Sequence, residues 1–104
     1  YSVGEALKLS GGKVTLCSGT TKPEFVCVGP ANGAGEVPCV AVQDYMEFET
    51  TLAVAPADSA AIGVGDKVTI HTDGMQVTAT KTSGVAQIVA LDGQAVGDRV
   101  VVRF

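Results

Sequence analysis

The chain has 104 residues, the size of one domain, which is long enough to bury a core without disulfide or metal staples. Its aromatic residues are two tyrosines and three phenylalanines, so Val, Ala, Ile and Leu must build that core. A net charge of −4 with scattered basic residues argues against nucleic acid as a partner, and no apolar run reaches the ~18 residues that span a bilayer. Abundant β-branched residues and thirteen glycines predict an all-β fold.

The N-terminal stretch 1–9 alternates only weakly between apolar and polar residues, and we expect it to form an arm. Alternation becomes clear in Lys13-Val-Thr-Leu16, which predicts a strand. Two further short strands are predicted at 25–28 and 37–42, the second introduced by Gly35-Glu36. We therefore predict that the first part of the chain forms short strands separated by glycine turns.

A longer strand is predicted over 45–54, where Met46, Phe48 and Leu52 fall on one face. Pro56 should end it, because proline lacks the amide hydrogen that a ladder needs. Asp58 or Ser59 suits the cap of a helical turn. We expect at most one such turn, near 57–62.

The strongest local pattern is a hairpin over 66–80, folded at Asp73-Gly74. Asp-Gly is favoured in the two-residue type I′ turn because both central residues take positive φ. This turn predicts two apolar pairs on one face, Ile70 with Val77 and Val68 with Ala79. The polar face then pairs His71 with Gln76, Thr69 with Thr78, and Lys67 with Thr80.

The two halves of the chain contain similar short sequences. Lys67-Val-Thr-Ile70 repeats Lys13-Val-Thr-Leu16, and a glycine followed by an acid introduces the Val-rich runs at 37–42, 67–70 and 99–104. We expect glycine to make each turn and the acid to be solvated. Together with a further strand at 85–91 and a turn at Asp92-Gly93, this predicts a degenerate duplication of two similar β-units. We expect a single domain, 1–104, folded as a small antiparallel barrel or β-clip.

No constellation in the sequence favours catalysis or a cofactor. His71 is the sole histidine, its predicted sheet neighbours would not activate it, and no Gly-x-Ser-x-Gly elbow occurs. The cysteines lack the paired spacing of zinc ligands, and Glu47 and Glu49 lack a calcium loop. The turn at Asp73-Gly74 carries no lysine, against a lipoyl or biotinyl carrier. We expect no enzyme, no cofactor and no metal.

The three cysteines, Cys17, Cys27 and Cys39, fit no disulfide framework by spacing. The first expectation is free thiols that serve as small core hydrophobes. The alternative is one disulfide pair with the third thiol left over.

Several runs together resemble the small head-decoration, or capsid cement, proteins of bacteriophages. The resemblance is carried by Ile62-Gly-Val-Gly-Asp-Lys-Val-Thr-Ile70, by 73–74 and 84–86, and by Val96-Gly-Asp-Arg-Val-Val-Val-Arg-Phe104. Weaker matches in the first half are 9–16, 23–25 and 35–36. The three cysteines are not a feature that the family leads us to expect.

The resemblance implies a structural protein of the virion, located on the capsid surface and assembled in the bacterial host cytoplasm. Its copies, as trimers or monomers, would bind the lattice of the major capsid protein and stabilise the head. Candidate partner contacts are large apolar residues of the arm and two aromatics: Tyr1, Val3, Leu7, Tyr45 and Phe104. The alternative is a small ligand- or carbohydrate-binding β-module of a larger surface protein, although the chain has no Trp for a sugar platform.

Overall fold

The computed structural model describes residues 3–43, 46–56 and 61–104, which contain eight short strands and no helix. The strands are β1 Ala6–Ser10, β2 Lys13–Leu16, β3 Phe25–Cys27, β4 Cys39–Ala41, β5 Phe48–Thr51, β6 Lys67–Val68, β7 Ala86–Leu91 and β8 Arg99–Arg103. They form two four-stranded antiparallel sheets, which confirms the all-β expectation. The helical turn expected near 57–62 falls mainly on 57–60, outside the described residues, and Ala61 and Ile62 are not helical.

The first sheet has the order β2-β1-β3-β4, and we call it with its loops the N-terminal lobe. The β1–β2 hairpin turns at Gly11 and Gly12, which both have positive φ (59° and 79°) between the paired Ser10 and Lys13. This is the geometry of a two-residue type I′ turn. The expected arm is wrong from residue 6 onward, because Ala6 and Leu7 lie in the interior strand β1 and are buried.

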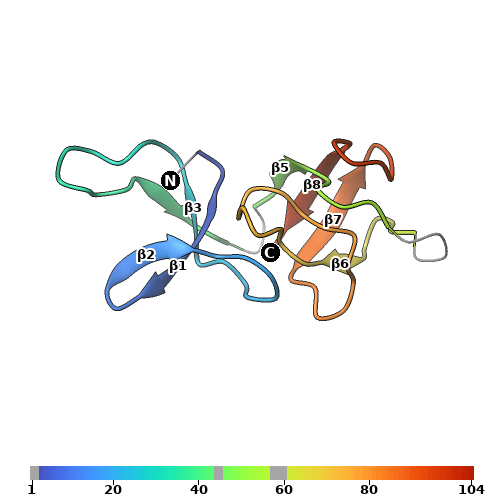
Figure 1. Ribbon diagram of the computed structural model, residues 1–104, viewed down its shortest axis with the longest axis horizontal. Helices are drawn as coiled ribbons and strands as arrows, with labels where there is room; N and C mark the ends of the chain where they lie inside the picture. Colours follow the sequence, from blue (N-terminus) through green and yellow to red (C-terminus); the bar gives the residue numbers. More distant parts are fainter. Residues whose placement is uncertain (1–2, 44–45, 57–60) are drawn as a thin grey trace.

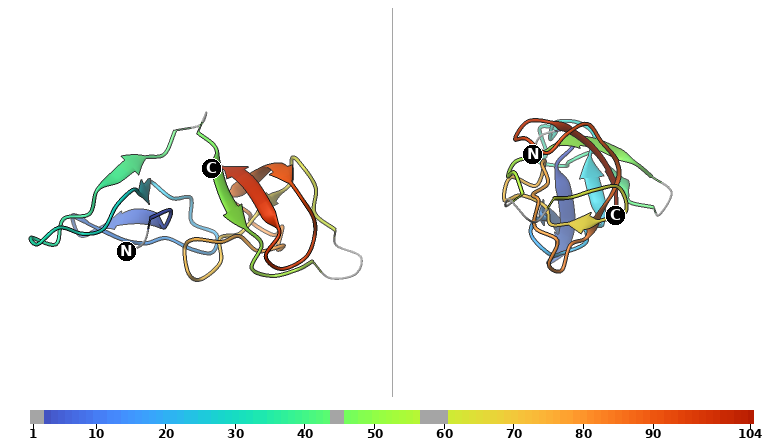
Figure 2. Two further views of the ribbon diagram at one scale, coloured as in Figure 1. Left: turned by 90° about the horizontal axis from the view of Figure 1, so that it is seen from above. Right: turned by 90° about the vertical axis from the view of Figure 1, so that its right-hand side faces the viewer.

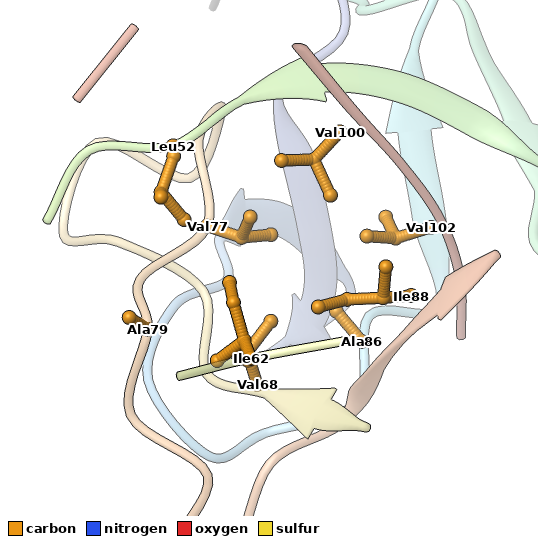
Figure 3. Packing of buried hydrophobic residues seen from close by; sticks show 9 residues of the cluster. All are labelled: Leu52, Ile62, Val68, Val77, Ala79, Ala86, Ile88, Val100 and Val102. Atoms are coloured by element: carbon orange, nitrogen blue, oxygen red, sulfur yellow. The ribbon is translucent and has the colours of Figure 1, made fainter. Parts of the chain in front are cut away.

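The second sheet has the order β5-β8-β7-β6 and belongs to the C-terminal lobe, residues 46–56 and 61–104 (Figure 1). Strands β6, β7 and β8 follow one another, and β5 pairs with β8, the arrangement of a Greek key. The register between β7 and β8 shifts between Ile88 and Ala90, which marks a bulge. Nine apolar residues converge inside this lobe (Figure 3): Leu52, Ile62, Val68, Val77, Ala79, Ala86, Ile88, Val100 and Val102.

The expected duplication is wrong at the level of topology, because the two sheets order their strands differently. A closed barrel is wrong as well. In the C-terminal lobe, single bridges from Leu52 to Val77 and from Val77 to Ile70 continue the sheet beyond β5. Isolated bridges are not a continuous ladder, so the sheet curls around its core without closing.

The hairpin predicted over 66–80 forms over 69–80, with the predicted pairing of Ile70 and Val77 but with a different turn. The predicted pairs Val68 with Ala79 and Lys67 with Thr80 are wrong, because the Thr69 amide donates to the Thr80 carbonyl and the register is shifted there. Ile70 bridges Val77, and the hydroxyls of Thr69 and Thr78 lie 2.7 Å apart. Asp73 does not have positive φ, and the Gly74 amide donates to the His71 carbonyl, which is a type I turn. The Asp73 carboxylate accepts from the amides of residues 75 and 76, giving a four-residue loop in place of the type I′ turn.

The two turns that lead into β6 and β8 have the same hydrogen-bonded form. In Gly63-Val-Gly-Asp66 and Ala95-Val-Gly-Asp98 the aspartate amide donates to the carbonyl three residues earlier, across a glycine with positive φ. Each carboxylate also accepts from the amide of that first residue, at 2.9 Å for Asp66 and 3.0 Å for Asp98. The expectation that these acids are merely solvated is therefore wrong, since they close the turns that lead into β6 and β8.

The two lobes lie end to end in a body of 47 × 24 × 22 Å (Figure 2). The hairpin 69–80 of the C-terminal lobe joins them. Ile70 exchanges backbone hydrogen bonds with Gly19, and the Ala6 amide donates to the Gly74 carbonyl at 2.7 Å. A Cβ on Gly74 would come within 2.3 Å of Leu16 Cδ1, so the hairpin tip is in direct contact with the N-terminal lobe.

Candidate interaction site

Phe104 marks the junction of the lobes. Its half-buried ring packs against the nine-residue core of the C-terminal lobe and also against the cluster of Ala6, Cys17 and Ile70. The ring of Phe48 lies beside it, with the centroids 5.5 Å apart and the planes tilted by 39°. This is a favourable geometry for an aromatic pair. Two hollows flank Phe104, one apolar and one polar.

The apolar hollow is a cavity of about 90 Å³ between the lobes. Its lining comes from β1, β3, β5, β8 and the tip of the hairpin, and includes Ala6, Val26, Phe48, Met75, Val102 and Phe104. A space of this size holds a few waters or one small apolar group. It is too small for a drug-sized ligand, which needs several hundred cubic ångströms.

The polar hollow has a volume of about 470 Å³ and brings together three basic side chains, Lys22, Lys67 and Arg103. The sheet register explains two of them. Lys67 of β6 lies opposite Gln87 of β7, and Gln87 lies opposite Arg103 of β8, so the three residues form a row across the sheet. Arg103 Nε donates to Gln87 Oε1 at 3.3 Å. Lys22 reaches the hollow from the N-terminal lobe.

The wall of the hollow depends on a tight turn before β7. Ser83 has φ of 57°, the one positive value at a non-glycine position within the described ranges. A Cβ on Gly84 would lie 2.3 Å from the Lys67 carbonyl oxygen, so glycine is required there. The turn thus brings its backbone against β6, beside the basic row.

The predicted contact residues divide into three groups. Phe104 lies at the junction, and Val3 is 63% exposed on the N-terminal lobe. Leu7 has no exposed surface, so this fold does not present it to a partner. Tyr1 and Tyr45 lie outside the described residues.

The sequence pattern alone did not indicate the basic row. Lys67 was placed on the polar face of its hairpin, and Arg103 in a Val-rich strand. Their neighbourhood follows from the order of β6, β7 and β8, which the sequence does not state.

Ionisable groups elsewhere in the described ranges take part in smaller, separate contacts. Within the described ranges, no three His, Cys, Asp or Glu side chains gather as a metal ion would require. Glu49 and Asp92 both approach Arg99, at 3.2 and 3.4 Å, and the Glu49 hydrogen bond raises the pKa of that guanidinium. Burial raises the pKa of the Cys17 thiol, which keeps it protonated at neutral pH.

No protein-family model, curated protein or solved structure matches this chain. Among the described residues, no helix has the length and apolar character to cross a membrane. A functional proposal therefore rests on two observations. One is the pair of hollows at the junction of the lobes, and the other is the resemblance of the turn and strand sequences to phage head-decoration proteins.

Proposed function

We propose that the chain is a non-enzymatic structural protein of a virion, which decorates an icosahedral phage capsid and stabilises the lattice of the major capsid protein. The sequence resemblance supports this role, and so does the build of the molecule. Two β-lobes joined through backbone hydrogen bonds make an elongated body suited to spanning neighbouring subunits. Binding to such a lattice requires a surface and no reactive group.

The basic hollow beside Phe104 is the observation that supports a specific contact face. Three of seven basic residues line one hollow in a chain whose net charge is −4. Charge complementarity favours acidic side chains on the partner, and it speeds association and fixes orientation. A half-buried aromatic ring at the edge of the hollow suits the role of an anchor. We therefore place the capsid contact on this face.

Co-sedimentation with purified expanded heads of the source phage tests the role. The chain should pellet with heads, saturate at a fixed number of copies, and raise the temperature at which heads lose their DNA. Absence of binding to heads would overturn the proposed function.

The contact face has its own test within the same assay. Lys67→Glu and Arg103→Glu should each weaken binding by roughly tenfold or more, and the effect should shrink at high salt. Lys13→Glu is the matched control, because it makes the same charge change at an exposed position of β2. Equal weakening by all three variants would show that net charge matters and that the face is placed wrongly.

A further inference from the structure

Two of the three cysteines lie directly opposite each other in the N-terminal lobe. The register of β3 and β4 pairs Phe25 with Ala41, Val26 with Val40, and Cys27 with Cys39. Residues opposite each other in an antiparallel pair point to the same face of the sheet. The two thiols are therefore on one face of adjacent strands.

The hydrogen bonds around the pair show which kind of position it occupies. The Val28 amide donates to the Pro38 carbonyl, and the Val42 amide donates to the Glu24 carbonyl, both at 3.0 Å. Hydrogen-bonded and non-hydrogen-bonded pairs alternate along an antiparallel ladder. Because 28/38 and 24/42 are hydrogen-bonded pairs, 26/40 is one too, and Cys27/Cys39 is a non-hydrogen-bonded pair.

Non-hydrogen-bonded pairs bring their side chains closest, with Cα atoms about 4.5 Å apart. A disulfide spans Cα separations of about 4.4–6.8 Å, so this position admits one with little movement of the backbone. Cys17 has no such neighbour. It lies in the cluster with Ala6 and Ile70, and its thiol donates to the Thr21 carbonyl at 3.2 Å.

The two thiols differ in access to solvent. Cys27 is fully buried, and its Sγ donates to the Gly29 carbonyl at 3.0 Å. Cys39 is half-buried on the edge strand β4. An external reagent would therefore meet Cys39 first, with Cys27 next to it as the resolving thiol.

We propose that Cys27 and Cys39 are a modification site, a cross-strand pair that a small-molecule disulfide such as oxidised glutathione converts to a disulfide. The Cys39 thiolate attacks one sulfur of the reagent and releases one thiolate. The Cys27 thiolate then attacks Cys39 Sγ in the mixed disulfide and releases the second. The protein gives up two electrons and two protons, and the reagent becomes two thiols.

The bond would stabilise one edge of the first sheet. It closes the loop 28–38 and fixes the edge strand β4 to β3. Closing a loop of this length should raise the midpoint of thermal unfolding by on the order of 10 °C. Cys17 stays a thiol throughout.

The experiment treats the reduced full chain with oxidised glutathione and counts thiols after denaturation. We expect the three thiols of the reduced chain to fall to one, a mass loss of two hydrogen atoms, and a peptide linking Cys27 to Cys39. Cys17→Ala should lose both of its thiols in the same way. Cys39→Ser, at a half-buried position that tolerates the change, should form no intramolecular link and show no rise in the thermal midpoint.

Two outcomes would overturn the proposal. One is retention of all three thiols, or of stable glutathione adducts, in excess oxidised glutathione. The other is a link that includes Cys17. Neither outcome bears on capsid binding, which is measured separately.

Discussion

The C-terminal and N-terminal lobes have the same number of strands and very different interiors. Nine buried apolar residues fill the C-terminal lobe. The N-terminal lobe buries five apolar residues, Ala6, Leu7, Cys17, Val26 and Cys27, and the cluster of Ala6 and Cys17 is completed by Ile70, which the C-terminal lobe contributes. Small cores provide little stabilisation. The N-terminal lobe therefore depends on its neighbour for part of its interior.

This dependence arises from the hairpin 69–80, which contacts both lobes. Its residues bridge to Leu52 at the end of β5 through Val77, and they contact the N-terminal lobe through Ile70 and Gly74. A change in the C-terminal core should therefore unfold both lobes. A change at the hairpin tip should affect mainly the N-terminal lobe.

The largest effect is expected from Ile88→Ala, which leaves a cavity at a fully buried position of the C-terminal core. The free energy of unfolding should fall by about 2–5 kcal/mol in urea denaturation. Hydrogen exchange should speed up in both lobes. Val96→Ala, at a 63% exposed position, is the control and should change stability by less than about 0.5 kcal/mol. If exchange accelerates in the C-terminal lobe alone, the lobes are independent.

Gly74→Ala tests the contact between the lobes. Both Gly74 and Gly12 have positive φ, 71° and 79°, but a Cβ on Gly12 meets no atom within 4 Å. Gly12→Ala should therefore lose only about 1–3 kcal/mol to backbone strain. Gly74→Ala should lose about 1–3 kcal/mol more, because the new methyl displaces Leu16.

The location of the effect distinguishes this variant from a general loss of stability. Amide exchange in Gly74→Ala should accelerate most in β1 and β2. Equal losses of stability in the two glycine variants would contradict the proposed contact.

A smaller effect is expected at the capped turns. Asp66→Ala and Asp98→Ala each remove an acceptor for a backbone amide and should lower stability by about 1 kcal/mol. Asp→Asn at the same positions keeps an acceptor oxygen and should lose less. Thermal unfolding of the four variants measures the difference. An Asn variant as unstable as its Ala counterpart would show that charge, and not the turn hydrogen bond, is what matters.

The smallest effect on stability is expected at alkaline pH and arises in the N-terminal lobe. Burial raises the pKa of Cys17 above 9.0, so the folded state holds this proton more tightly than the unfolded state does. The stabilisation is complete below pH 9 and is lost as pH rises through the folded pKa. Stability of the reduced protein should decline above pH 9, and Cys17→Ala should decline less steeply. Identical slopes would contradict this assignment.

Local sequence patterns predicted the strands well and the turns unevenly. Alternation located β2 and β5, the short run at 85–91 located β7, and the pairing of Ile70 with Val77 followed from counting outward from the turn. The type I′ turn was assigned to Asp73-Gly74 but forms at Gly11-Gly12. The side chain of Asp73 selects another turn by accepting two amides, which the dipeptide alone does not reveal.

Features that depend on which distant strands pair were harder to predict from the sequence. Similar strand sequences suggested a duplication, but strand order depends on which edges pair, and the two lobes differ there. The basic row of Lys67 and Arg103 could not be predicted for the same reason, because it depends on the register between strands. The facing pair of Cys27 and Cys39 depends on such a register as well. Leu7 was expected at the surface because its weak alternation did not disclose an interior strand.

The proposed function requires that the face around Phe104 contacts a capsid lattice. Hydrogen exchange of the chain bound to heads of the source phage, compared with the free chain, tests it most directly. We expect binding with slowed exchange at the ends of β6, β7 and β8 that carry Lys67, Gln87 and Arg103. Binding that leaves these amides unchanged and protects the opposite end of the molecule would contradict the placement of the contact face, and no binding at all would contradict the function.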